Sequence, residues 1–128
     1  MKVLLDTHVL LWFLEGDREK LSMESFDTII NDDNEKYVSV ASLWEIAIKV
    51  NIGKLKLLSD FPRLETLIAL NGFQIVPIEY HHLIEYHKLE IYHRDPFDRI
   101  LIAQSACEGF QIITKDPSLS LYKIKIIW

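Results

Sequence analysis

Short apolar segments alternate along the whole chain with longer segments of helical periodicity. The apolar segments predict strands at residues 2–6, 36–40, 73–78, 110–114 and 124–127. The periodic segments predict helices at residues 7–14, 19–31, 41–52, 60–71, 80–89 and 97–108. Such alternation is typical of crossover units, which build a parallel sheet with helices on both faces. We therefore predict an α/β fold around a mostly parallel sheet of four to five strands.

The composition fits one ordinary globular domain over residues 1–128. Hydrophobic residues make up 49% of the chain, which also has four Gly and four Pro, unlike a disordered sequence. Cys107 is the only cysteine, so no internal disulfide can form, and we expect it to be a small core residue. No apolar run approaches the ~18 residues that span a bilayer, and we find no secretory leader before Asp6. These features predict a cytoplasmic protein.

Four carboxylates stand at the edges of segments that should otherwise be core: Asp6, Glu45, Asp98 and Asp116. Asp6 and Asp116 follow predicted strands, and parallel sheets bind ligands outside the carboxyl ends of their strands. Glu45 interrupts a helical stripe of apolar residues. Because burying like charges together is costly unless a cation is present, we predict one shared acidic pocket.

Each acid also has a purely structural interpretation. Asp6 could cap the helix that starts at Thr7. Glu45 could form an exposed ion pair with Lys49 one helical turn later, although the apolar stripe favours an inward-facing Glu45.

The segment Asp95-Pro96-Phe97-Asp98 has the same ambiguity. Asp95 is a good N-cap, Pro96 a good first helical residue, and Asp98 falls at the third position, where an acid favours the helix dipole. Asp116 could belong to a turn after a strand. Capping accounts for any one of these acids, but it does not account for the whole set.

The donor set favours hard cations. Carboxylates without a cysteine pair or a clustered histidine site select Mg²⁺ or Mn²⁺. Such ions can activate a water molecule and stabilise the leaving oxygen of a phosphodiester, so phosphodiester hydrolysis is the predicted reaction. Thr7 and Thr114 stand beside two of the acids, where they could orient a carboxylate or a metal-bound water.

Histidines and basic residues give weaker signals. His81, His82, His87 and His93 match no standard zinc spacing, and we expect them on the surface. Arg99 could contact a substrate phosphate or pair with an acid on the surface. The net charge of −5 argues against a protein that coats nucleic acid by bulk electrostatics, but it does not exclude an enzyme that binds a polyanion locally.

Four segments cover most of the chain and occur in a characteristic order: LLDTHVLLW at 4–12, VSVASLWEI at 38–46, HRDPFDRILIAQ at 93–104 and ITKD at 113–116. Together they resemble the PIN-domain family, and in particular the VapC-type toxins of toxin–antitoxin pairs. The resemblance implies a three-layer α/β/α sandwich. It also implies an endoribonuclease that depends on Mg²⁺ or Mn²⁺, with catalytic and metal-binding acids Asp6, Glu45, Asp98 and Asp116.

The same resemblance implies a mechanism and partners. Metal-activated water would attack the RNA backbone without using the 2′-hydroxyl as nucleophile, and the toxin would be a homodimer held inactive by a small antitoxin protein. Two other functions stay open: a PIN-fold binding module that uses exposed apolar residues such as Trp12, Phe13 or Trp44, and a metal-dependent hydrolase of DNA or small phosphate esters. Asp95, a fifth acid, could be a cap, a support for the metal site or a ligand.

Overall fold

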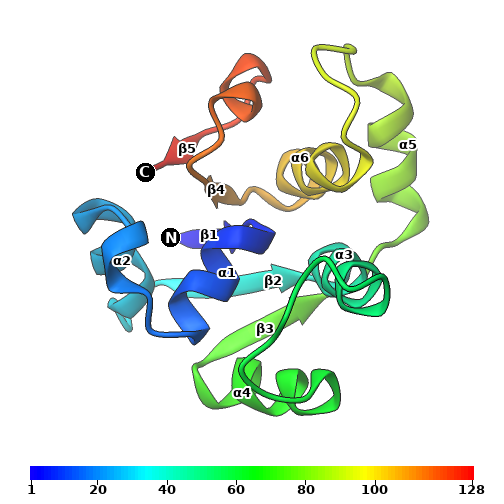
Figure 1. Ribbon diagram of the computed structural model, residues 1–128. Helices are drawn as coiled ribbons and strands as arrows, with labels where there is room; N and C mark the ends of the chain where they lie inside the picture. Colours follow the sequence, from blue (N-terminus) through cyan, green and yellow to red (C-terminus); the bar gives the residue numbers. More distant parts are fainter.

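The computed structural model describes residues 1–128 and centres on one sheet of five parallel strands (Figure 1). The strands are β1 (Lys2–Leu5), β2 (Glu35–Ser39), β3 (Phe73–Val76), β4 (Gln111–Ile113) and β5 (Ile126–Ile127). Their order across the sheet is β3-β2-β1-β4-β5. All five predicted strands are present, and the prediction of an α/β fold around a parallel sheet is confirmed.

Six α-helices connect these strands. They are α1 (Thr7–Leu14), α2 (Met23–Ile30), α3 (Val40–Asn51), α4 (Leu64–Leu70), α5 (Tyr80–Lys88) and α6 (Pro96–Glu108). Three short 3-10 helices complete the chain: η1 (Arg18–Lys20), η2 (Phe61–Arg63) and η3 (Pro117–Leu121). The longest helix, α6, has 13 residues, and no helix combines the length and apolarity that crossing a membrane requires.

Two helices differ from the prediction. A single helix over 19–31 is wrong, because the Ser22 hydroxyl accepts the backbone N–H of Ser25 at 3.0 Å and starts α2 at the next residue. Serine at this position satisfies an N–H that the first helical turn leaves free. The helix predicted from Asp60 begins as η2, and the Asp60 side chain makes no capping bond there.

The side chains of β1 divide the core into two layers. Val3 and Leu5 point to one face and Leu4 to the other, since successive side chains alternate along a strand. Val3 and Leu5 pack with residues of α1, α2, α3 and α4, whereas Leu4 packs with residues of α6 and η3. Helix α5 packs on α6. Helices thus cover both faces of the sheet, as the three-layer arrangement requires.

The register of the central strands defines one edge of the sheet. Leu5, the last residue of β1, aligns with Val38 of β2 and with Ile113 of β4. Because all three strands are parallel, the segments that follow them start at the same edge. This edge is where Asp6 leaves β1 and Thr114 leaves β4.

Cys107 is not a core residue, contrary to the prediction. Its side chain is exposed in the last turn of α6, and its Sγ lies 3.8 Å from the carbonyl oxygen of His81. Ala103, one turn earlier, is fully buried. The inner face of α6 therefore ends before the helix does.

Candidate active site

Asp6 follows β1 directly and begins α1. Its Oδ1 accepts the backbone N–H of Val9 at 2.8 Å, and its Oδ2 accepts the hydroxyl of Thr114. The residue is only 8% exposed, and burial raises the pKa of its carboxyl despite both hydrogen bonds. The capping interpretation of Asp6 and its position at the sheet edge are therefore both correct.

Asp116 is joined to Asp6 through Thr114. The Thr114 oxygen accepts the backbone N–H of Asp116 at 3.0 Å while its proton goes to Asp6. Asp116 is exposed, and its Oδ1 accepts from the backbone N–H and the hydroxyl of Ser118 at 2.9 and 2.7 Å. Burial raises the pKa of Asp116, but the bonds from Ser118 and the charges of two histidines outweigh it, so the pKa lies below its ordinary value.

Glu45 reaches the same edge from α3. Its side chain is 13% exposed. One oxygen accepts the hydroxyl of Thr7 at 2.6 Å, and the other lies 3.0 Å from Nζ of Lys49. The inward-facing carboxylate and the Lys49 ion pair are thus two features of one side chain, because a carboxylate has two oxygens to share.

Asp95 and Asp98 have different places at the start of α6. The Asp95 side chain is exposed, and its Oδ1 accepts the N–H groups of Phe97 and Asp98 at 2.9 and 3.3 Å. Asp95 is therefore the N-cap, as one of its three interpretations stated. Asp98 occupies the third helical position, and only 20% of its side chain is exposed.

Asp98 responds to the other acids through charge. Burial first, and then the negative charges of Asp95, Asp116, Asp6 and Glu45, raise its pKa from 3.8 to about 7. Like charges have this effect when they are close and partly shielded from water. The fold thus brings the predicted acids to one edge of the sheet, and we call Asp6, Glu45, Asp98 and Asp116 the acidic rim.

Arg99 is buried behind this rim. It is 7% exposed and forms no ion pair with an acid, so of its two interpretations the surface pair is wrong. Its Nη1 donates to the hydroxyl of Tyr122 at 2.8 Å and to the carbonyl of Glu90 at 2.9 Å. This burial favours a supporting role for Arg99 over a contact with substrate phosphate.

Sequence analysis did not identify two further residues near Asp98. Nδ1 of His93 lies 2.9 Å from the Tyr122 hydroxyl, and its Nε2 lies 3.3 Å from Oδ2 of Asp98. His93 stands five residues before Asp98, which is a signal that could have been used. Nothing in the sequence near Tyr122 indicates its contact with this segment.

Residues 3–125 match the family described as the PIN domain. The chain belongs to the PIN domain family. A search of curated proteins found no match.

Solved structures share the fold of this PIN domain at low sequence identity. Chains from three crystal or complex structures superpose on 98% of it. VapBC2 from Rickettsia felis, bound to a DNA fragment from its promoter, matches over 97% of its chain with a TM-score of 0.68 and 13% identity. FitAcB from Neisseria gonorrhoeae matches over 96% with a TM-score of 0.65 and 19% identity. A toxin–antitoxin complex from Klebsiella pneumoniae matches over 96% with a TM-score of 0.62 and 16% identity.

The rim of this PIN domain suits an ion that keeps part of its water shell. No three rim acids each bring an oxygen within 4.8 Å of the others; only His81, His82 and Glu108 form such a group. Mg²⁺ usually binds through one or two carboxylates and retains several waters. These hard oxygen donors fit Mg²⁺ or Mn²⁺. The residues that could hold such an ion are Asp6, Glu45, Asp98 and Asp116.

The histidine cluster has a structural role instead. Nε2 of His81 and Nε2 of His82 each lie 2.9 Å from Oε1 of Glu108. His82 is 1% exposed, so the expectation of a surface histidine is wrong there. Its Nδ1 accepts the backbone N–H of Glu79 at 3.0 Å, which leaves the ring proton on Nε2. Nε2 therefore donates to Glu108, and has no lone pair for a metal in this arrangement.

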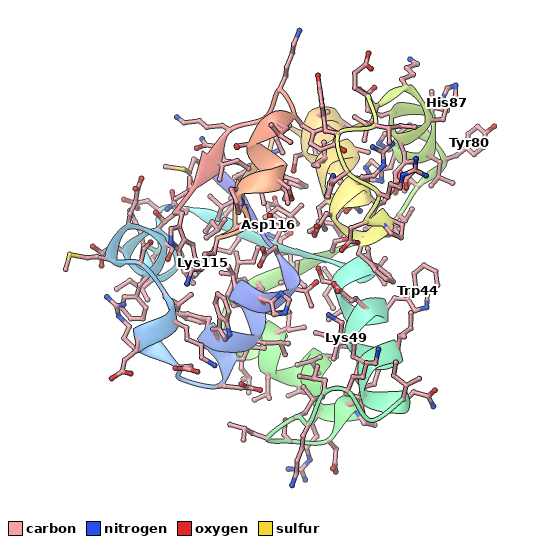
Figure 2. All side chains as sticks on the ribbon, turned by 45° about the horizontal axis from the view of Figure 1, so that its top comes forward. Trp44, Lys49, Tyr80, His87, Lys115 and Asp116 are labelled. Atoms are coloured by element: carbon pink, nitrogen blue, oxygen red, sulfur yellow. The ribbon has the colours of Figure 1, made fainter.

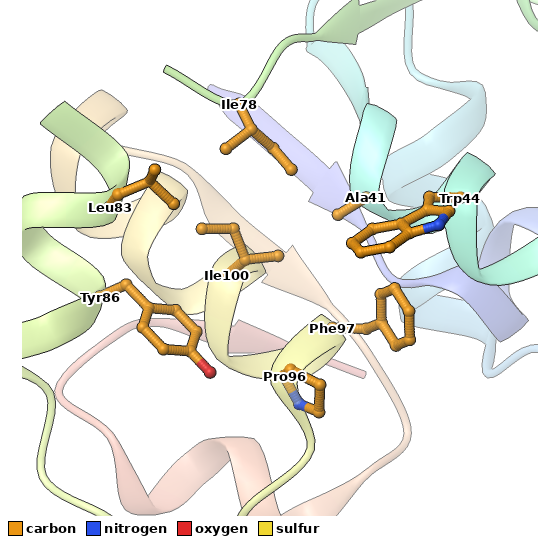
Figure 3. Close-up of a pocket in the computed structure, with 8 residues that line it drawn as sticks. All are labelled: Ala41, Trp44, Ile78, Leu83, Tyr86, Pro96, Phe97 and Ile100. Atoms are coloured by element: carbon orange, nitrogen blue, oxygen red, sulfur yellow. The ribbon is translucent and has the colours of Figure 1, made fainter. Parts of the chain in front are cut away.

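An apolar pocket of about 210 Å³ lies beside the rim, between α3, α5 and α6 (Figure 3). It is lined by Ala41, Trp44, Ile78, Leu83, Tyr86, Pro96, Phe97 and Ile100. Trp44 is 60% exposed, and its ring meets Phe97 edge-on at 5.3 Å. Figure 2 shows Trp44 on α3 and Tyr80 on α5 projecting outward on the same side of the molecule. Trp12 and Phe13, by contrast, pack against the core.

Proposed function

We propose that this PIN domain is a metal-dependent endoribonuclease and the toxin of a toxin–antitoxin pair. The observation that carries the proposal is the convergence of the acidic rim, where burial first and then the neighbouring carboxylates raise the pKa of Asp98 to about 7. A site that collects negative charge in this way is suited to a divalent cation and a phosphodiester. A bound Mg²⁺ or Mn²⁺ would polarise a water molecule and neutralise the charge that develops on the leaving oxygen.

Neighbouring residues orient two of the carboxylates in the acidic rim. Thr114 fixes Oδ2 of Asp6 from β4, and the Val9 N–H fixes Oδ1 from α1. Thr7 fixes one oxygen of Glu45, and Lys49 offsets part of its charge. Each of these carboxylate oxygens keeps a lone pair that no protein donor uses, which leaves the acids able to hold an ion or its water.

We propose RNA as the substrate. The proposed toxin role is supported by the fold and by the sequence resemblance. The similar structures include a complex described as a toxin–antitoxin complex, and the four sequence segments resemble VapC-type toxins. A small antitoxin protein would then cover the rim, and both proteins would act in the cytoplasm. The whole sequence over 1–128 would form a single nuclease domain.

Metal removal tests the proposed activity. We expect the protein to cleave single-stranded RNA in Mg²⁺ or Mn²⁺, and EDTA to lower the rate about a hundredfold or more, since metal catalysis supplies several kcal/mol of transition-state stabilisation. The measurement is gel-resolved cleavage of labelled RNA oligonucleotides of varied sequence. A 2′-deoxy nucleotide at the cleaved position should leave the rate within about threefold, because water and not the 2′-hydroxyl attacks.

Each alternative has its own result in this assay. Cleavage that persists in EDTA would contradict the metal mechanism. Faster cleavage of DNA of the same sequence, or of a small phosphate ester, would indicate a different hydrolase. Tight binding to a partner protein without metal uptake in calorimetry would indicate a binding module.

We also propose that two copies associate through the apolar pocket. Leu83 on α5 is 47% exposed and stands across the pocket from Trp44 (Figure 3). Apolar surface gathered in this way on two neighbouring helices is typical of an interface between proteins. Leu83→Lys should therefore shift the mass measured by light scattering from twice 15.0 kDa to 15.0 kDa.

Leu70→Lys is the matched control. Leu70 is 77% exposed on α4, outside the pocket, so the same substitution there should leave the dimer intact. A wild-type protein that is monomeric at micromolar concentration would contradict the proposed dimer.

A further inference from the structure

The buried guanidinium of Arg99 holds the segment between α5 and α6 through hydrogen bonds to its backbone. Arg99 donates Nη1 to the carbonyls of Glu90 and His93, at 2.9 and 3.4 Å, and to the hydroxyl of Tyr122 at 2.8 Å. A guanidinium is always a donor. The Tyr122 oxygen must therefore accept this hydrogen bond, and its own proton has to point elsewhere.

The only partner for that proton is His93. Nδ1 of His93 lies 2.9 Å from the Tyr122 hydroxyl, which has no other acceptor within reach. If Nδ1 accepts this bond, the ring proton of a neutral imidazole is on Nε2. Nε2 faces Oδ2 of Asp98 at 3.3 Å, so it donates to the carboxylate. The opposite tautomer would direct a lone pair at a carboxylate oxygen and leave the tyrosine proton unpaired.

We propose that His93 is a positioning residue for Asp98, kept in its Nε2–H form by Tyr122 and Arg99. The inference rests on the proposed function, in which Asp98 belongs to the metal-binding rim. Repulsion from Asp6, Glu45 and Asp116 would otherwise turn the Asp98 carboxylate outward. The Nε2–H bond holds Oδ2, and Oδ1 forms no hydrogen bond within the protein, so it remains free to face an ion.

The chain of hydrogen bonds that leads from Arg99 to Asp98 differs from a coincidental surface contact in two ways. Its members come from three separate parts of the chain: the α5–α6 segment, α6 itself and the residue that follows η3. The side chains of His93 and Asp98 are only 18% and 20% exposed. Groups that orient a metal ligand in this way typically contribute about 10–100-fold in metal affinity or activity.

Nitrogen-15 NMR of the metal-free protein at pH 8, where Asp98 is ionised, tests the tautomer without reference to activity. We expect Nε2 of His93 to be protonated and Nδ1 to be unprotonated. The Nε2 proton should exchange slowly with solvent. Tyr122→Phe should accelerate this exchange. Tyr92→Phe is the matched control, because Tyr92 is an exposed residue whose ring meets Tyr122 edge-on at 5.0 Å but whose hydroxyl makes no hydrogen bond. A protonated Nδ1 in the wild type, or equal exchange in both variants, would overturn the proposal.

Kinetics test the consequence for the site. At saturating Mn²⁺, Tyr122→Phe should lower kcat for RNA about 10–100-fold with KM changed less than about threefold. His93→Gln, which keeps a donor for Asp98, should retain more activity than His93→Ala, whereas His87→Gln on the surface should match the wild type. Equal loss in His93→Gln and His93→Ala would overturn the positioning role. Absence of any cleavage by the wild type would refute the proposed function, and the NMR result would still decide the tautomer.

Discussion

Replacement of Asp6 by asparagine should lower the rate of Mn²⁺-dependent RNA cleavage about a thousandfold and leave the melting temperature unchanged or higher. Loss of one central carboxylate removes several kcal/mol of metal-assisted stabilisation, and ~4 kcal/mol corresponds to about a thousandfold in rate. The fold should tolerate the change, because an asparagine oxygen can still accept the Val9 N–H as an N-cap. Burial raises the pKa of the Asp6 carboxyl, so its neutral replacement also removes a costly charge.

The experiment pairs single-turnover cleavage rates with thermal melting of the same preparations. Asp33→Asn is the matched control, since Asp33 is exposed in the turn before β2 and its side chain forms no hydrogen bond. It should leave both quantities unchanged. An Asp6→Asn protein that melts at the wild-type temperature and still cleaves RNA within tenfold of the wild-type rate would refute the catalytic role of the rim.

Asp98→Asn should stabilise the metal-free protein at pH 8. The folded-state pKa of Asp98, about 7, is above its ordinary value of 3.8. The ionised form is therefore disfavoured in the folded protein, and stability falls as pH rises from about 4 through 7. Above pH 7 the full penalty applies, which we put at about 2 kcal/mol after allowance for partial exposure. The corresponding gain in melting temperature is about 7 °C.

The pH dependence distinguishes relief of charge repulsion from a stabilisation by asparagine that is independent of charge. At pH 5 Asp98 is already protonated in the folded protein, so Asp98→Asn should raise the melting temperature there by much less than at pH 8. Differential scanning fluorimetry in EDTA across this range is the measurement. An equal gain at both pH values, or no gain at pH 8, would mean that the acids do not repel each other at the rim.

Most of the fold could be predicted because local signals and tertiary structure agree. Each strand is a short apolar segment, and each helix carries a period of 3.6 residues. The prediction failed where a local capping hydrogen bond was overlooked. The Ser22 hydroxyl caps α2, which therefore starts later than the periodicity indicates. Register and strand order could not be predicted, because they depend on contacts between segments far apart in sequence.

The position of the rim acids at one edge could be predicted from sequence, and so could the role of Thr7 and Thr114 in orienting two of them. The buried residues behind the rim could not. Asp6, Asp98 and Asp116 stand at element boundaries, which are readable positions. His82 was placed on the surface, and a surface pair was one of two interpretations of Arg99, because their partners, Glu108 and Tyr122, lie more than twenty residues away. A buried polar residue is recognisable only with its partner, and distance in sequence conceals that partner.

Two structural roles that were weighed as alternatives in the sequence occur together in the same side chain. Asp6 is both an N-cap and a rim acid, and Glu45 both faces inward and pairs with Lys49. A carboxylate has two oxygens and about four acceptor sites. One oxygen can serve the backbone or a neighbouring side chain while the other serves the site.

The bond between Thr114 and Asp6 spans 108 positions of the sequence, and this separation has a consequence during synthesis. Strand β1 emerges from the ribosome well before β4, which is one of its two neighbours in the sheet. A nascent chain that ends before Gln111 already contains Asp6, Glu45 and Asp98. It lacks the strand that orders Asp6 and the segment that supplies Asp116, so the acidic rim cannot assemble until β4 and the residues after it have been made.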